Sequence, residues 1–584
     1  MKLLTYIPFI IFTIFISCSV PDTKNSIGQP NILLIMVDDM GYGDVSLANN
    51  PYTKTPNLDE LASNSVNFKY FYVSPVCAPT RASLLTGRYH QEVGVRSVTN
   101  GYETINPEAV TLAEMLKSAG YQTGIYGKWH LGEYYPSLPN AQGFDDYFGF
   151  RTGHTEDYFD PVLEHNGTME ETSGYIADIL TDKAIDFMVR TTRQPFFCYL
   201  PYNTPHSPLQ IEEEKFQPFL DMGLEEKVAR VYAMVENIDY NIGRIINTLE
   251  SVKILDNTIV IFLSDNGPIS GWQIPQEKMR YNAGLKDQKF TVYEGGIRTQ
   301  CYWMWQGRWT PFYDTTSIAA HIDVVPTIAS ILDISLADSL SIDGIDLTPT
   351  LTDQEPIEKE RYLFEDYDIT ALRDPELFKG GMARQGNWKI VSGSELYNLS
   401  NDPGEENNVA NAHPEILQKM KNDYADYYKK SYSKSHFQPQ PIPVGYDEEN
   451  PTLIKMHHGL ASGNVEFSRA AGGTHPTGVD GNWTSGWEEP GDAMKWEVNF
   501  TTDARYQLGL SMNGKIMDQT SEFNILIGDK EFEVALPELA SDDWQYIPLL
   551  EAEASGISPV IIKLSGKDKS DIININELVI TKLD

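Results

Sequence analysis

The chain has 584 residues and is strongly acidic, because 45 Lys and Arg residues stand against 82 Asp and Glu residues, a formal net charge of −37. Such a surface repels phosphate backbones, which disfavours nucleic-acid binding. Hydrophobic residues make up 41% of the chain, enough to bury a core, so wholesale disorder is excluded. The length predicts about four domains, or one large domain with additional units, and four cysteines are too few for a disulfide scaffold.

The N-terminal segment is typical of an export signal. Lys2 precedes an apolar run over residues 3–16, which is shorter than the roughly 20 residues that a membrane-spanning helix needs. The run ends in a serine and Cys18, which resembles a bacterial lipoprotein signal with lipid on Cys18; an ordinary cleaved signal is the alternative. We therefore expect a signal peptide over 1–18, a tether over 19–29, and export to the periplasm or cell surface of a Gram-negative bacterium. A lipid anchor would be the only contact with the membrane.

Strand patterns alternate with helical patterns over residues 30–355. A continuous apolar run, typical of a buried parallel strand, lies at 31–37, and further strand patterns lie at 120–127, 195–202 and 258–267. Helical periodicity occurs at 57–64, 111–120, 177–189 and 225–250. This alternation predicts an α/β domain with a parallel or mixed sheet covered by helices on both faces.

The pattern changes after residue 355. Short strand patterns and one helical segment predict a small α+β subdomain over 356–435. The Pro-rich stretch 436–452 is typical of a linker. Short alternating strands separated by turn residues then fill 453–584, which predicts a β-sandwich.

Hard oxygen ligands follow two of the predicted strands. Asp38 and Asp39 come directly after the first strand, and Asp265 and Asn266 come after the strand that starts at residue 258. Ligands bind at the carboxyl ends of strands in open α/β sheets, and paired buried carboxylates are costly without a cation. This donor set suits Ca²⁺ or Mg²⁺ rather than zinc, whereas each pair alone could be a solvated turn or a helix cap.

The motif CAPTR at 77–81, which continues as ASLLTG, is the most specific local feature. Cys77 can start a helix, whose N-terminus favours anions. Arg81 then lies one turn later on the same face. Taken alone, the cysteine could also be a small buried side chain.

Several blocks occur in the order that is typical of one family. They are NILLIMVDDMGYGD, CAPTRASLLTG, GYQTGIYGKWHLG, PHSPL, SDNG, KFTVYEGGIR and LYNLSNDPGEENNVA. Over residues 30 to about 410 the chain thus resembles the formylglycine-dependent sulfatases, and among them a bacterial polysaccharide sulfatase. The resemblance implies an alkaline-phosphatase-like α/β fold, in which helices sandwich a large mixed sheet and a small α+β subdomain follows. The β-sandwich would be an extra domain.

The resemblance also implies a cofactor. A formylglycine-generating enzyme would oxidise Cys77 to formylglycine (3-oxoalanine), whose hydrate attacks the sulfur of a sulfate ester and later expels sulfate as the aldehyde reforms. The divalent ion, Ca²⁺ or else Mg²⁺, would be held by Asp38, Asp39, Cys77, Asp265 and Asn266.

The same resemblance implies roles for the cationic residues. Arg81 would stabilise the formylglycine, and Lys128 and Lys289 would contact the sulfate. His130 would be the base that lets the aldehyde reform, and His206 would serve the leaving oxygen. The sequence KDQKF around Lys289 departs from the glycine-rich approach that is common in the family.

The substrate that we expect is a sulfated poly- or oligosaccharide, of an algal type such as ulvan. Candidate substrate-binding residues in the loop RTGHTEDYFDP are Arg151, His154 and Asp160. The region 453–584 could bind carbohydrate, or it could only pack against the catalytic body. Its aromatic candidates for stacking on sugars are Trp483, Trp487, Trp496 and Trp544.

Two alternatives remain open at this point. The chain could be a phosphonate monoester or phosphodiester hydrolase, because related enzymes with similar motifs cleave those esters. It could also be a surface glycan-binding protein without catalysis, if Cys77 stays a thiol.

Overall fold

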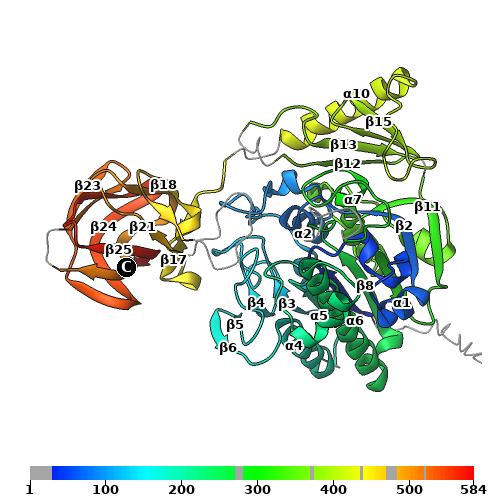
Figure 1. The fold of residues 1–584 in the computed structure, drawn as a ribbon, viewed down its shortest axis with the longest axis horizontal. Helices are drawn as coiled ribbons and strands as arrows, with labels where there is room; N and C mark the ends of the chain where they lie inside the picture. The colour runs from blue at the N-terminus through cyan, green and yellow to red at the C-terminus, as the bar shows by residue number, and fades with distance from the viewer. Residues whose placement is uncertain are drawn as a thin grey trace, which may run out of the picture.

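The computed structural model describes residues 29–191, 193–269, 280–358, 360–368, 374–433, 438–468, 483–517 and 521–584. The expected signal peptide, Cys18 and nearly all of the expected tether lie outside these ranges. Within the described ranges, no helix is both long and apolar enough to cross a bilayer. Figure 1 shows a large α/β body, a smaller layer packed beside it, and a β domain at one end of the molecule.

An eleven-stranded mixed sheet forms the centre of the body, in the order β11-β2-β10-β8-β1-β7-β3-β4-β5-β6 with β9 paired to β2. Its strands are β1 Asn31–Val37, β2 Val66–Tyr72, β3 Gln122–Lys128, β4 Asp146–Phe150, β5 Val162–His165, β6 Thr168–Glu171, β7 Phe196–Pro201, β8 Thr258–Ser264, β9 Arg298–Thr299, β10 Cys301–Trp305 and β11 Phe312–Ala320. The run β8-β1-β7-β3-β4 is parallel, whereas β10 and β5 pair antiparallel with its two ends. The carboxyl ends of β8, β1, β7 and β3 therefore meet at one edge.

The two faces of this sheet bury different helices, because side chains alternate along each strand. Leu33, Ile35 and Val37 of β1 share a buried cluster with helices α1, α4, α5 and α6. Ile32 and Leu34 share another cluster with helices α2, α3 and α8. The helices of the body are α1 Pro56–Ser63, α2 Cys77–Thr86, α3 Leu112–Ser118, α4 Ile176–Arg190, α5 Glu213–Asp221, α6 Glu226–Ser251, α7 Glu294–Ile297, α8 Val324–Ile331 and α9 Thr348–Asp353. This double burial explains the continuous apolar sequence of β1.

A second, smaller sheet follows the body. It is antiparallel in the order β12-β13-β14-β15 and packs against one helix. Its elements are β12 Tyr362–Asp366, β13 Gly381–Gln385, β14 Trp388–Val391, β15 Glu395–Asn398 and α10 Pro414–Tyr432. This is the small α+β unit that the sequence predicts.

The C-terminal β domain encloses one separate core. Its elements are β16 Ile442–Val444, β17 Thr452–Lys455, β18 Leu460–Ser462, β19 Glu466–Phe467, β20 Thr484–Ser485, β21 Ala493–Ile516, β22 Glu522–Ile527, β23 Lys530–Ala535, β24 Leu539–Gly566 and β25 Ile572–Lys582. Where the sequence predicts only short strands, the structure has the long strand β21, which pairs with β24 through several register shifts. Such shifts let one strand bend around a core.

Two details of this domain differ from expectation. Trp487 and Trp496 are each 1% exposed and belong to the core, so neither can stack on a sugar. The indole of Trp487 also donates to the hydroxyl of Thr484, which satisfies its polar atom inside the core. The stretch expected as a linker contains β16, which pairs in parallel with β21. The β domain therefore begins earlier than the composition indicates.

Candidate active site at the carboxyl edge of the sheet

The ends of β1 and β8 bring four buried polar side chains together. The two strands pair in parallel along their whole length, so the residues that follow them lie side by side. The backbone N–H of Asp39 donates to Oδ1 of Asp265 at 3.2 Å, and Nδ2 of Asn266 donates to Oδ1 of Asp39 at 2.7 Å. Asp38, Asp39, Asp265 and Asn266 are at most 1% exposed. The predicted cluster is thus assembled by the sheet itself.

Three oxygen atoms of this cluster lack hydrogen-bond donors among the described residues. They are Oδ1 of Asp38, Oδ2 of Asp39 and Oδ1 of Asn266. A buried oxygen atom without a partner is costly, and most buried polar atoms have one. Carboxylate and amide oxygens are the ligands that Ca²⁺ and Mg²⁺ take. The site therefore fits a hard divalent cation, and ligand atoms of Asp38, Asp265 and Cys77 also lie within 4.8 Å of one another.

Cys77 is the first residue of helix α2, and its side chain is buried beside the acidic cluster. Every residue of this helix is buried, and Gly87 ends it with a φ of 68°, a left-handed conformation that favours glycine. Arg81, one turn after Cys77, places its guanidinium NH2 2.7 Å from Oδ2 of Asp265 and its NH1 3.0 Å from the carbonyl of Lys128. Arg81 thereby joins the helix to two strand ends.

The end of β3 contributes a lysine and a histidine. Nζ of Lys128 donates to Oδ2 of Asp38 at 2.6 Å. His130 has a φ of 59°, which is strained for a residue with a side chain, and its Nδ1 lies 3.4 Å from Sγ of Cys77. Nε2 of His130 lies 2.9 Å from the carbonyl of Val98, which can only accept, so Nε2 carries the proton. The Nδ1 lone pair of His130 therefore faces Cys77.

His206 and Lys289 lie at Asp39. Nζ of Lys289 donates to Oδ1 of Asp39 at 2.6 Å, and Nε2 of His206 lies 3.7 Å from Oδ2. Nδ1 of His206 lies 2.7 Å from the carbonyl of Ser207, so Nδ1 carries the proton of the neutral ring. His206 keeps 20% of its side chain exposed, whereas Lys289 keeps 4%. All six residues that the sequence singles out as catalytic thus surround one cluster.

The electrostatics of the acidic residues show the cost of gathering them. Burial alone would raise the pKa of Asp38. The positive charge of Lys128 and of neighbouring cationic groups lowers this pKa by more than burial raises it, so the net shift is downward. The pKa of Asp39 is lowered in the same way, chiefly by Lys289. Burial and the charge of Asp38 raise the pKa of Asp265 well above its usual range. A bound cation would relieve this repulsion.

Both histidines of the cluster are neutral near pH 7. Burial, reinforced by Lys128, lowers the pKa of His130 to about 3. Burial lowers the pKa of His206 to about 4, although Asp39 opposes the shift. Each ring therefore has one nitrogen that can accept a proton. Nδ1 of His130 faces Cys77, and Nε2 of His206 faces Asp39.

The three residues expected to bind substrate have different surroundings. The guanidinium of Arg151 contacts Glu164 at 2.7 Å and Glu449 at 2.6 Å, so it links the body to the β domain instead of facing an open site. The carboxylate of Asp160 is exposed and accepts from the N–H of Gly174 at 2.6 Å, which closes a turn. His154 is half-buried in the same loop.

This loop nevertheless touches the cluster through a glycine. A Cβ atom added at Gly153 would come within 2.6 Å of Nε2 of His130, so only glycine lets the loop pass so close to the ring. The carbonyl of Arg151 also accepts from the N–H of His130 at 3.0 Å. Residues 151–154 therefore pack against His130, although the side chain of Arg151 points to its own carboxylate partners.

A buried pair that the sequence analysis missed holds the backbone of Asp39. Asp39 has a φ of 65°, and its carbonyl accepts from NH2 of Arg280 at 2.6 Å. Nε of Arg280 also donates to the carboxylate of Asp44 at 2.9 Å. Asp44 stands in the quoted block GYGD, but its partner lies 236 residues away, so no local pattern reveals the pair.

Comparison with known proteins agrees with this geometry. The family model Sulfatase matches residues 30–334. Human arylsulfatase A is 31% identical over 462 residues, which cover 67% of this chain and 86% of the human protein. N-acetylgalactosamine-6-O-sulfatase of Bacteroides thetaiotaomicron is 29% identical over 494 residues, which cover 68% of this chain and 93% of the bacterial protein.

A solved structure is similar over a comparable length. The crystal structure of Ps i-CgsB in complex with k-i-k-neocarrahexaose has a TM-score of 0.64 and 28% sequence identity, and covers 70% of this chain and 95% of its own. The alkaline-phosphatase-like α/β fold is thus confirmed, and the chain belongs to the sulfatase family as a sulfuric ester hydrolase.

Proposed function

We propose that this hydrolase removes sulfate from sulfated poly- or oligosaccharides, with a nucleophile made from Cys77 and with a bound Ca²⁺ ion. The observation that carries the proposal is the buried constellation around Asp38 and Asp39. There, the Cys77 side chain and the proton-accepting nitrogen of His130 converge with three oxygens that accept no hydrogen bond from the described residues. Mg²⁺ is the second candidate, since it also prefers oxygen ligands.

The residues would hold the two groups as follows. Asp38, Asp39, Asp265 and Asn266 would ligate the ion together with the modified Cys77. When bound, the ion would polarise the sulfate, and the aldehyde hydrate made from Cys77 would supply the attacking hydroxyl. Conversion of Cys77 requires a formylglycine-generating enzyme as maturation partner.

The remaining charges suit an anionic ester. Lys128 and Lys289 each neutralise one carboxylate in this structure, and a bound cation would share that task and leave their ammonium groups to the sulfate oxygens. Arg81 would orient the modified side chain from its fixed position between Asp265 and the end of β3. This local cation set is necessary because the chain as a whole carries a net charge of −37.

The two histidines, His130 and His206, would transfer the protons in the reaction. Nδ1 of His130 faces the Cys77 side chain and can accept a proton from it, because Nε2 already donates to Val98. His206 would donate a proton to the leaving oxygen. It must therefore acquire a proton on Nε2, which an arriving anion favours electrostatically.

The proposal of a glycan substrate is based on the names of similar proteins. The names of the bacterial N-acetylgalactosamine-6-O-sulfatase and of Ps i-CgsB with its neocarrahexaose indicate that those proteins act on or bind carbohydrates. Within that class we propose an algal polysaccharide such as ulvan, and an exported, lipid-anchored protein in the periplasm or at the surface of a Gram-negative bacterium. His154 is the substrate-binding candidate that the geometry best supports, since its loop packs against His130.

Three experiments test the proposal. Release of sulfate from defined sulfated oligosaccharides, measured by ion chromatography, should be abolished by EDTA and restored by Ca²⁺; an unchanged rate after chelation would remove the ion from the mechanism. Parallel assays with aryl sulfate and an aryl phosphodiester separate sulfatase from phosphodiesterase activity. Peptide mass spectrometry at Cys77 should show the aldehyde or its hydrate, and an unmodified thiol in the native host would favour a non-catalytic glycan-binding protein.

A further inference from the structure

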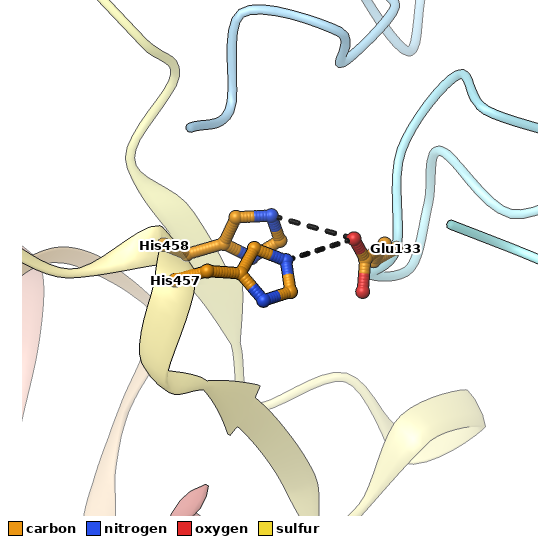
Figure 2. Close-up of side chains that lie close together, drawn as sticks. All are labelled: Glu133, His457 and His458. Carbon is orange, nitrogen blue, oxygen red and sulfur yellow. Dashed lines mark hydrogen bonds and ion pairs between the residues drawn. The ribbon is translucent and has the colours of Figure 1, made fainter. Parts of the chain in front are cut away.

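Two histidines of the β domain and one glutamate of the catalytic body meet at the junction of these two parts. His457 and His458 are the last residues of the 3-10 helix Met456–His458, and Glu133 follows β3, three residues after His130. Nε2 of His457 lies 3.2 Å from Oε1 of Glu133, and Nε2 of His458 lies 3.5 Å from the same oxygen. Figure 2 shows both rings pointing at this one atom.

The spacing of the three ligand atoms fits a metal ion as well as hydrogen bonds. A charge-assisted N–H···O bond is about 2.7–2.9 Å long. Two ligands bound at about 2.0–2.1 Å to a tetrahedral zinc ion lie about 3.3 Å apart, which is close to the observed 3.2 and 3.5 Å. Ligand atoms of Glu133, His457 and His458 all lie within 4.8 Å of one another.

The charge balance points the same way. Glu103 is a second carboxylate at this site, with Oε1 3.2 Å from Nε2 of His458. The side chains of Glu103, Glu133 and His458 are 5%, 9% and 4% exposed. Oε2 of Glu103 accepts no hydrogen bond from any described residue. Two buried carboxylates need compensating positive charge, which a divalent cation with two neutral imidazoles supplies.

The ring of His458 is held in the orientation that a ligand needs. Its Nδ1 lies 2.5 Å from the hydroxyl oxygen of Tyr134, which also accepts from the N–H of Lys455 at 3.0 Å. Tyr134 belongs to the body but is buried in the core of the β domain. Such a contact on the far nitrogen is what positions metal-binding imidazoles in proteins.

We propose that this junction binds one transition-metal ion of the zinc type, with His457, His458 and Glu133 as ligands and Glu103 beside the remaining position. Imidazole and carboxylate together suit zinc, whereas the all-oxygen set at Asp38 suits Ca²⁺. The ion would tie the β domain to the segment that follows His130. The proposal does not depend on the substrate or on the modification of Cys77.

The test uses the full chain, stripped with a chelator and then given excess Ca²⁺ to occupy the oxygen-rich site. ZnCl₂ is added, unbound metal is removed by desalting, and zinc is counted by mass spectrometry. We expect one zinc ion per chain in the wild type and in the controls His413→Gln and Asp38→Asn. We expect at least tenfold weaker binding in His457→Gln and Glu133→Gln. A wild type that retains no zinc, or variants that retain as much as the wild type, would overturn the proposal.

A second measurement separates loss of a ligand from loss of folding. Zinc should raise the melting temperature of the wild type by several degrees and should leave that of His457→Gln unchanged, because a ligand that binds only the folded state stabilises it. Co²⁺ bound to the wild type should give the intense visible absorption of a four-coordinate site. Equal zinc-dependent shifts in the wild type and in His457→Gln would contradict the proposed ligands even if Glu133→Gln failed to fold.

Discussion

At the scale of single residues, the site depends on side chains that local backbone geometry forces into unusual positions. Asp39 and His130 both have a positive φ, and each is held there by long-range hydrogen bonds, from Arg280 to the Asp39 carbonyl and from the His130 N–H to the Arg151 carbonyl. Strain of this kind persists only where the surroundings impose it. Its consequence here is that Nδ1 of His130 faces Sγ of Cys77 at 3.4 Å.

Replacing Cys77 tests whether the chemistry depends on that side chain. We expect Cys77→Ser to lose at least about 10³-fold in kcat, roughly 4 kcal/mol in activation free energy, because serine cannot form the aldehyde under the same maturation. The melting temperature should change little, since the two side chains are similar in size. The matched control is Cys301→Ser, a buried strand thiol outside the site, which should keep near-normal kcat. Near-normal hydrolysis by Cys77→Ser would contradict the assignment.

His206 should matter in proportion to the difficulty of the leaving group. The leaving group of an aryl sulfate is a stable phenolate, whereas the departing oxygen of a sugar must be protonated as it leaves. We expect His206→Ala to lower kcat by less than about tenfold on 4-nitrophenyl sulfate and by more than about 100-fold on a sugar sulfate. Steady-state kinetics on the two substrates give the comparison. Equal losses on both would show that His206 does not act on the leaving oxygen.

At the scale of elements, the sequence predicts those parts of the site that follow strands. Asp38, Asp265 and Lys128 come at strand ends, and parallel pairing alone brings them to one edge. The role of Arg151 could not be predicted, because its partner Glu449 is 298 residues away in another domain. The burial of Trp496 could not be predicted from the sequence either, since an aromatic residue in an alternating strand can face the core or the solvent.

Trp483, which is half-buried, and the exposed Trp544 are the remaining aromatic candidates of the β domain for contact with a polymer. The rings of Trp483 and Trp544 lie 6.0 Å apart, and Trp544 is 38% exposed. We expect Trp544→Ala to weaken retention in gels that contain sulfated polysaccharide by about five- to tenfold, the effect of losing about 1 kcal/mol of stacking. Tyr313→Ala, an exposed aromatic on the catalytic body, is the control. Unchanged retention of Trp544→Ala would leave the β domain with a packing role only.

At the scale of the whole molecule, a local cluster of cationic side chains must attract an anionic substrate although the protein surface is acidic. The chain carries a net charge of −37, yet Lys128, Lys289 and Arg81 concentrate positive charge at one buried point. The acidic surface repels a polyanion from a distance, and salt screens this repulsion beyond the Debye length, whereas contacts inside the buried site are screened much less. Encounter and binding should therefore respond to salt differently.

Ionic strength separates these two effects. The Debye length falls from about 30 Å at 0.01 M salt to about 8 Å at 0.15 M. Over this range we expect kcat/KM on a highly sulfated polymer to rise at least severalfold, because screening removes repulsion from the distant surface. On singly charged 4-nitrophenyl sulfate the change should be less than about twofold. A fall in kcat/KM on the polymer as salt increases would instead require an extended cationic surface that guides the chain to the site.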